Sequence, residues 1–167
     1  MIRFNDISVV LQGPVQASAE RLQVPGITHH CIASIREFLP GATVILSTWE
    51  GQGYSGLIPD ILLLNQDPRP NVIAKNVHGN VLYQNFNRQI VSTQQGLSSV
   101  TTKYAVKLRA DNYLLGNQFV FYQQDFPKRA VADRRFQQRV VFSSCYFRKF
   151  SEGFEVIMHP SDYFNTA

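Results

Sequence analysis

The sequence predicts an α/β fold with a mostly parallel sheet and helices packed on it, and two observations support this. Short aliphatic runs that end in polar or turn-forming residues alternate with stretches of helical periodicity. The order is strand, helix, strand, strand, helix, strand, an alternation typical of parallel sheets covered by helices. The 167 residues, 44% hydrophobic and 17% charged, are sufficient for one domain with a substantial core.

Strands are predicted where β-branched and aliphatic residues concentrate and a turn signal follows. The four main ones are Ile7 to Leu11, Thr43 to Leu46, Ile61 to Leu64 and Tyr104 to Leu108. The pattern loosens after Asp111. Arg139 to Phe142 and Glu155 to Met158 then predict further strands in a short mixed C-terminal part.

Helices are predicted where apolar residues recur at spacings of three and four. The first face comprises Cys31, Ile32, Ile35, Phe38 and Leu39, and a Pro-Gly pair ends that helix. The second comprises Phe86, Ile90, Thr93 and Leu97. We expect the second face to be the apolar side of its helix, packed on the sheet. The polar stretch from Arg69 to Asn80 has no periodicity, so neither helix nor strand is predicted there.

Charge and cysteine content narrow the functional classes. The net charge of +4 favours anionic ligands, such as nucleotide diphosphates, or weak contact with an acidic membrane surface. Basic residues form no dense stripe, so we expect no nucleic-acid partner. Cys31 and Cys145 provide neither a disulfide framework nor zinc-ligand spacing. Arg3 and Asp6 interrupt the first apolar stretch, which excludes a signal peptide and predicts a cytoplasmic protein or one at the inner face of the membrane.

The segment from Lys107 to Asn112 carries the clearest chemical signal, because a buried strand ends there in cations, a carboxylate and an amide. Ligands of parallel α/β sheets bind at the carboxyl ends of strands. Lys107, Arg109 and Asp111 alternate onto one face of an extended segment. A guanidinium can neutralise phosphate, and a carboxylate can hold a cation, although Arg109 and Asp111 can also simply pair. The segment predicts a nucleotide-linked substrate, with Mg²⁺ or Mn²⁺ at Asp111 and Asn112.

Two other strand ends carry candidate binding residues. At Gln12-Gly13-Pro14, the glycine permits close approach of the backbone to a nucleotide, although a plain tight turn is the simpler interpretation of these residues alone. Exposed Thr48 and Glu50, after the second strand, can hydrogen-bond a ribose or a base.

Three further residues have both a chemical and a structural interpretation. Arg88, near the start of the second predicted helix, can pair with a phosphate or lie on a solvated helix face. His159 and Asp162 can position an acceptor hydroxyl and remove its proton. Alternatively, Ser161 or Asp162 caps a helix.

Six separated motifs in this chain together resemble the WavE lipopolysaccharide-synthesis family. They are residues 7–14 (ISVVLQGP), 34–36 (SIR) leading to 39–42 (LPGA), 46–51 (LSTWEG), 87–93 (NRQIVST), 107–112 (KLRADN) and 159–164 (HPSDYF). The resemblance spans nearly the whole chain. It implies a bacterial glycosyltransferase of surface-polysaccharide or lipopolysaccharide assembly, with the nucleotide-sugar-binding GT-A fold. It also favours a nucleotide loop at Gly13.

Two departures from the family pattern matter. The GT-A metal motif is Asp-x-Asp, and Arg109 replaces its first carboxylate. Family members also continue well past the last motif, so we expect the natural protein to be longer. Within this chain we expect one domain, with a donor-binding core at 1–112 and an acceptor-side extension at 113–167.

The predicted reaction moves a sugar from a nucleotide diphosphate donor to a hydroxyl of a glycan or lipid-linked acceptor. Fixed cations or a metal would stabilise the departing diphosphate, and Asp162, His159 or Glu50 would deprotonate the acceptor. A nucleotidyltransferase is one alternative, although residues 15–18 are neither glycine-rich nor basic. A non-catalytic glycan- or partner-binding domain is the other, since Asp-x-Asp is missing. No G-x-G-x-x-G follows the first strand, which argues against a dehydrogenase.

Overall fold

A computed structural model describes residues 2–18, 22–125, 132, 140–142, 150–151, 154–155 and 164–166. After a short 3₁₀ turn at Phe4–Asp6, the strands and helices of the first part follow in the order β1 (Ile7–Gln12), α1 (Ile27–Phe38), β2 (Thr43–Trp49), β3 (Ile61–Asn65), β4 (Asn71–Lys75), β5 (Val81–Gln84), α2 (Phe86–Ser98) and β6 (Tyr104–Arg109). The last part contains α3 (Phe119–Asp125), β7 (Val141–Phe142), β8 (Phe150–Ser151), β9 (Phe154–Glu155) and β10 (Phe164–Thr166).

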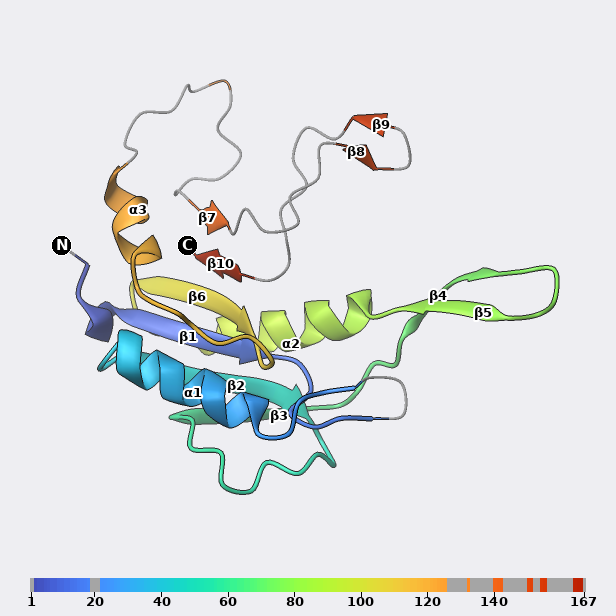
Figure 1. Ribbon diagram of the computed structural model, residues 1–167, viewed down its shortest axis with the longest axis horizontal. Coiled ribbons are helices and arrows are strands. Elements are labelled where there is room, and N and C mark those ends of the chain that lie inside the picture. The colour runs from blue at the N-terminus through green and yellow to red at the C-terminus, as the bar shows by residue number, and fades with distance from the viewer. Residues whose placement is uncertain are drawn as a thin grey trace.

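The main sheet has a parallel half and a short mixed edge. Within the described residues its strand order is β3-β2-β1-β6-β10-β7. The first four strands are parallel, and β10 runs antiparallel to both β6 and β7 (Figure 1). The predicted α/β class and its four main strands are therefore confirmed.

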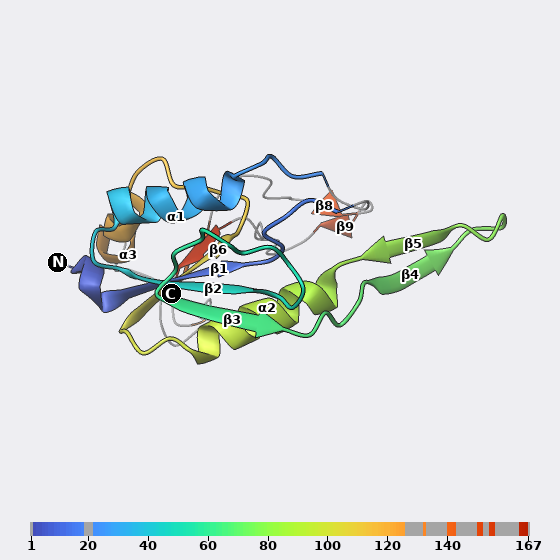
Figure 2. The ribbon, with the colours of Figure 1, turned by 90° about the horizontal axis from the view of Figure 1, so that it is seen from below.

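Helix α1 covers one face of this sheet and builds the main core (Figure 2). Its apolar positions Cys31, Ile32 and Ile35 are buried, as the sequence predicts. They meet alternate residues of the strands, and the cluster includes Ile7, Val9, Leu11, Val44, Leu46, Val106 and Leu108. The apolar strand residues have no water contact on this side, which is the main source of stability for the fold.

Helix α2 lies on the opposite face, with the bounds that the sequence suggests but with the wrong side predicted to be buried. Phe86, Ile90 and Leu97 are exposed, whereas Ser92 and Gly96 are buried against the sheet. The reason is close packing. A Cβ at Gly96 would collide with the Val10 side chain, so the helix approaches β1 through its smallest residues.

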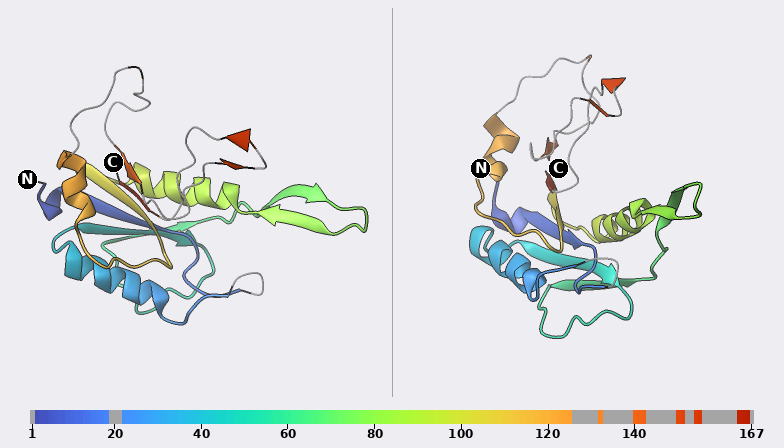
Figure 3. Two further views of the ribbon diagram at one scale, coloured as in Figure 1. Left: turned by 45° about the horizontal axis from the view of Figure 1, so that its top comes forward. Right: turned by 45° about the vertical axis from the view of Figure 1, so that its right-hand side comes forward.

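Strands β4 and β5 form a hairpin that the sequence analysis missed. The hairpin pairs antiparallel and projects from the start of α2, away from the body of the molecule (Figures 1 and 3). The backbone N–H of Asn87 donates to Asn71 Oδ1 (2.9 Å), which fastens α2 to the base of the hairpin. A register shift between Val72 and Ala74 interrupts the strict alternation by which strands are recognised.

The mixed C-terminal part agrees with its prediction only at a few positions. Strand β7 falls within the expected strand at 139–142, and β9 overlaps the start of the one expected at 155–158. Residues 139 and 156–158 lie outside the described residues.

Candidate functional site

The strand ends predicted to carry chemistry meet at one edge of the sheet. Strand β1 lies between β2 and β6, with Gln12 in register with Arg109 on one side and with Ser47 on the other. The chain moves outward from β1 to β2 and β3, then returns to the other side of β1 as β6. Ligands of doubly wound sheets bind at such a reversal. We call residues 12–14 and 109–112 the β1/β6 edge.

Backbone hydrogen bonds fix the two halves of the β1/β6 edge together. The N–H of Ala110 donates to the Gln12 carbonyl (2.9 Å), and the N–H of Gly13 donates to the Ser47 carbonyl (3.1 Å). The ends of β1, β2 and β6 therefore form one continuous rim, as the sequence analysis expected.

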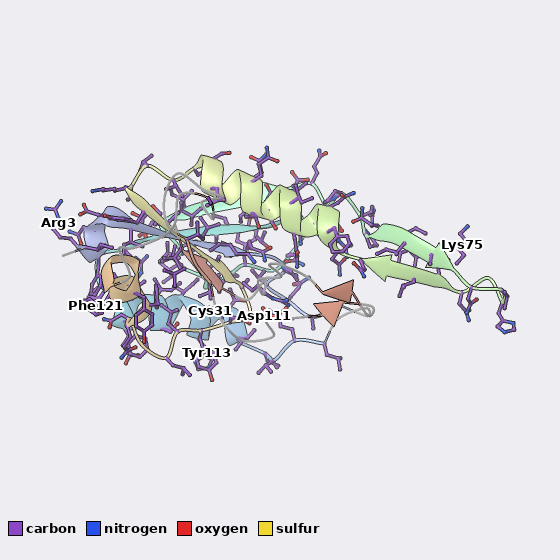
Figure 4. All side chains as sticks on the ribbon, turned by 90° about the horizontal axis from the view of Figure 1, so that it is seen from above. Arg3, Cys31, Lys75, Asp111, Tyr113 and Phe121 are labelled. Atoms are coloured by element: carbon purple, nitrogen blue, oxygen red, sulfur yellow. The ribbon has the colours of Figure 1, made fainter. Side chains whose placement is uncertain are left out.

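The first turn of α1 holds the β6 side of this edge. The Thr28 hydroxyl donates to the Ala110 carbonyl (2.8 Å), and the Cys31 thiol lies 3.3 Å from the same oxygen. Burial, with a smaller contribution from the Asp111 charge, raises the pKa of Cys31 to about 12. The thiol is therefore neutral at physiological pH, and Figure 4 places it near Asp111.

Gly13 is buried at the β1 side of the edge, and apart from its two chain neighbours no residue fills the space that a side chain there would take. Its φ of +111° is a conformation that other residues rarely adopt, and a Cβ built there has no neighbour within 4 Å. Pro14 beside it is half-buried. Gln52 accepts hydrogen bonds from the Val15 N–H (2.8 Å) and the Thr48 hydroxyl (3.0 Å), so it anchors the loop after Gly13 to the end of β2.

Arg109 and Asp111 pair with each other at the end of β6. The Arg109 guanidinium donates to both Asp111 oxygens, at 3.0 and 3.1 Å, and each side chain is about one quarter exposed. Lys107 lies two register pairs further from the edge, opposite Val10, and is only 9% exposed. Cationic groups and one carboxylate thus occupy the same side of β6 at the rim.

Gln12 is held by α2 and is not directed at solvent. It is buried, and its Oε1 accepts from the Ser92 hydroxyl (2.8 Å). Its role at the edge is carried by its carbonyl, which receives Ala110.

Arg88 forms an ion pair with Asp67, which lies just after β3. Its guanidinium donates to both oxygens of Asp67 (2.7 and 2.6 Å) and to Asn85 Oδ1 (3.0 Å). The Arg88 hydrogen bond lowers the pKa of Asp67 below its usual value. The Arg88 guanidinium therefore takes part in an ion pair that joins α2 to the residues after β3.

Thr48 and Glu50 differ in how far their side chains are exposed to solvent. Thr48 is fully buried, so the expectation of an exposed hydroxyl there is wrong; the reason is its contact with Gln52. Glu50 is exposed, and its backbone N–H donates to the Asn65 carbonyl (2.9 Å). Glu50 alone of the two presents a polar side chain at the end of β2.

His159 and Asp162, the expected acceptor-side residues, lie outside the described residues.

A divalent cation does not fit Asp111 and Asn112 as they are arranged. Both Asp111 oxygens accept from Arg109. With its amide nitrogen toward Asp111, Asn112 donates to Oδ1 (3.3 Å) and to the carbonyl (3.1 Å) of that residue. In the part of the chain that the structure describes, no three His, Cys, Asp or Glu side chains gather as ligands. A cation at Asp111 would have to displace the guanidinium.

Three contributors to the edge were not identified from the sequence: Thr28, Cys31 and Gln52. Thr28 lies in the first turn of α1, and a helix that runs back along a parallel strand begins at this edge of the sheet. Its position at the start of the predicted helix could therefore have identified it. Gln52 gave no such signal, because its contacts depend on how two loops fold against each other.

The fold and this edge define a parallel α/β protein with a polar, cation-bearing site where the strand order reverses. Residues 7–166 match the family of WavE lipopolysaccharide synthesis, and the chain belongs to that family. Membership implies a part in lipopolysaccharide synthesis. No match is found among curated proteins or among solved structures. None of the helices in the described residues is long and apolar enough to cross a membrane.

Proposed function

We propose that this protein is a glycosyltransferase that moves a sugar from a nucleotide diphosphate donor to a hydroxyl of a bacterial surface glycan. Family membership supports the glycan side of the proposal. The observation that carries the donor side is the pairing of Gln12 with Arg109 at the reversal of strand order, which brings the glycine turn beside a cationic strand end. We also propose that the four parallel strands are arranged as in the GT-A fold.

Gly13 supplies the approach for the donor. Gly13 itself is buried, but apart from its two chain neighbours no residue lies within 4 Å of the place of a Cβ, which leaves room for a pyrophosphate beside this turn. A side chain at this position would occupy that space and strain the turn, since the φ of Gly13 is positive.

Arg109 and Lys107 supply positive charge for the leaving diphosphate. Negative charge builds on that group as the sugar departs, and fixed cations in a partly buried site lower the barrier by stabilising it. Asp111 holds the Arg109 guanidinium by two hydrogen bonds, so it acts here as a positioning residue. We expect the donor to meet Arg109 at its exposed side.

The acceptor belongs to the other half of the proposal. Residues 113–167 would supply the acceptor side, with His159 or Asp162 removing the proton of the attacking hydroxyl, and Glu50 as the exposed alternative. The bond formed joins the acceptor oxygen to the anomeric carbon. The bond broken joins that carbon to the diphosphate, which leaves with the electron pair.

Calorimetric titration with nucleoside diphosphates, with and without Mn²⁺, tests the proposal. We expect binding by the wild type and a loss of about tenfold or more in affinity for Arg109→Met, since a charge-assisted contact to phosphate is lost. Arg36→Met is the matched control, because Arg36 pairs with Asp60 away from the edge. No binding of any nucleoside diphosphate would overturn the proposal.

The same titrations test the expected metal. Strict dependence of binding on Mn²⁺, lost in Asp111→Ala, would support Mg²⁺ or Mn²⁺ at Asp111 and Asn112. Equal affinity with Mn²⁺ and with a chelator would assign the charge to Arg109 and Lys107 instead.

A second candidate is a non-catalytic glycan- or partner-binding domain, and the closed Arg109–Asp111 pair favours it. Nucleotide-sugar hydrolysis distinguishes the two. Turnover that Arg109→Met abolishes supports the transferase, whereas glycan binding without turnover supports the second candidate.

A further inference from the structure

Exposed apolar side chains lie along the outer side of helix α2 and on both faces of the β4–β5 hairpin. On α2, Phe86 and Ile90 are 54% and 58% exposed. They share one side of the helix with Leu97, opposite the side that packs on the sheet. The remaining members belong to the hairpin: Val72, Ile73, Val77, Leu82 and Tyr83. We call this set the outer apolar surface.

The two parts of the outer apolar surface lie end to end. Only Asn85 separates β5 from α2, and the Asn87–Asn71 hydrogen bond joins the helix to the hairpin base. Figures 1 and 2 show the hairpin continuing the line of α2 beyond the body of the molecule. Exposed apolar side chains that follow one another along a helix and a projecting hairpin are typical of a docking surface.

The charge around the outer apolar surface is of one sign. No aspartate or glutamate occurs between Asp67 and Asp111, although the chain contains 12 acidic residues. Exposed Arg69 stands just before the hairpin, and exposed Lys75 stands in β4, far from the body (Figure 4). Apolar side chains flanked by cations, without any carboxylate, match the interface of an anionic lipid bilayer.

The same charge pattern disfavours a second copy as the occupant. In a two-fold interface a patch meets its own image, so Arg69 and Lys75 would face like charges without a carboxylate to compensate them. A bilayer rich in anionic headgroups meets both features of the surface. Tyr83 and Phe86 also have the bulk that favours the headgroup region.

We infer that the outer apolar surface, Phe86 and Ile90 of α2 together with the β4–β5 hairpin, docks the protein on an anionic phospholipid bilayer. The inference concerns where the protein works and is independent of the donor site at the β1/β6 edge.

Co-sedimentation of the full chain with vesicles tests the inference. Vesicles of phosphatidylcholine alone are compared with an equimolar mixture of phosphatidylcholine and phosphatidylglycerol. We expect binding to the mixed vesicles, weakened by salt. The double variant Phe86→Gln/Ile90→Gln should lower the partition coefficient at least about tenfold, because two apolar side chains no longer enter the interface. Ile58→Gln, an exposed apolar position in the loop from β2 to β3, is the matched control and should change little.

A charge variant separates the electrostatic part. Lys75→Glu should lower binding to the mixed vesicles at least about fivefold. Lys103→Glu, with the same change in net charge but beyond the far end of α2, should have a smaller effect. All substituted side chains are exposed, so urea midpoints near wild type are expected and verify that the variants fold.

Three results would overturn the inference. The first is no sedimentation with either kind of vesicle, and the second is equal binding to neutral and mixed vesicles. The third is a wild-type dimer in sedimentation velocity that becomes a monomer in the Phe86/Ile90 variant while that variant still binds vesicles. None of these bears on nucleotide binding, so the proposed function is tested separately.

Discussion

The ion pair between Arg88 and Asp67 makes part of the stability of the fold depend on pH. Its largest effect on Asp67 is the Arg88 hydrogen bond, which lowers the carboxyl pKa in the folded state. A lowered folded pKa means that the carboxylate stabilises the fold above the ordinary aspartate value of about 3.9. That stabilisation is lost as the pH falls through the folded pKa.

Replacing Asp67 by asparagine should therefore lower the free energy of unfolding at neutral pH by about 1–2 kcal/mol. The difference from wild type should shrink as the pH falls from ~5 to ~2, because the wild-type carboxyl is then protonated too. Urea denaturation across this range measures it. Asp6→Asn is the control: its partner Arg3 is exposed, and the variant should change the urea midpoint less. A difference that persists unchanged at low pH would contradict the assignment.

The hydrogen bond from Thr28 to the Ala110 carbonyl connects α1 to the candidate site. Thr28→Val keeps the shape but removes the donor, so the unfolding free energy should fall by about 1–3 kcal/mol. Thr28→Ser retains the hydroxyl and should lose less. Urea midpoints compare the two, and a larger loss in the serine variant would show that packing of the methyl group dominates.

At the scale of elements, Gly96 sets the distance between α2 and the sheet. Gly96→Ala improves helix propensity by about 1 kcal/mol, but its Cβ would collide with Val10. Overpacking of this kind costs about 1–3 kcal/mol, so we expect the collision to dominate and the melting temperature to fall. Gln94→Ala, on an exposed turn of the same helix, should hold or raise the melting temperature. A more stable Gly96→Ala variant would mean that α2 shifts at little cost.

The β4–β5 hairpin has few neighbours to protect its hydrogen bonds. Its strands pair only with each other among the described residues, and most of its side chains are exposed. Backbone amides in β4 and β5 should therefore exchange with solvent about a thousandfold faster than those of buried β1, by hydrogen-exchange mass spectrometry. Protection equal to that of β1 would mean that the hairpin is covered in solution. Addition of mixed vesicles should slow hairpin exchange selectively.

The accuracy of the sequence-based prediction also follows elements. The four parallel strands were recognisable because both faces of β1 and β2 are buried, which produces nearly continuous aliphatic runs. The face of α2 was not recognisable, because Ser92 and Gly96 look like a solvent-facing side while Phe86 and Ile90 look like a core. The hairpin escaped because its bulge disrupts alternation and polar residues surround it.

At the scale of the whole molecule, the candidate site was predictable in position but not in its contacts. Polar residues at the ends of parallel strands must share an edge, so Gly13 and Asp111 could be placed together from the sequence. The partners of Arg88 and Gln12 could not, because they depend on how α2 packs across strands distant in the sequence.

Ligand binding at an edge shared by α1, β1 and β6 should stabilise the whole fold. A nucleoside diphosphate at a hundred times its Kd should add about 2.7 kcal/mol and raise the melting temperature by several degrees. Arg109→Met, with an affinity about tenfold lower or more, should reduce this rise by about half or more, and Arg36→Met should keep it. Differential scanning fluorimetry measures both. An equal rise in the two variants would place the ligand away from the β1/β6 edge.

The alkylation rate of the buried Cys31 thiol, which lies against the Ala110 carbonyl, reports how often the structure around it opens. A cysteine with a pKa of about 12 and no access to solvent reacts with an alkylating reagent only when the layer that covers it opens. In a Cys145→Ser variant, the labelling rate of Cys31 therefore measures how often α1 moves away from the end of β6. A ligand bound at the β1/β6 edge would slow the labelling of Cys31, so the labelling rate reports occupancy of this site without a substrate assay.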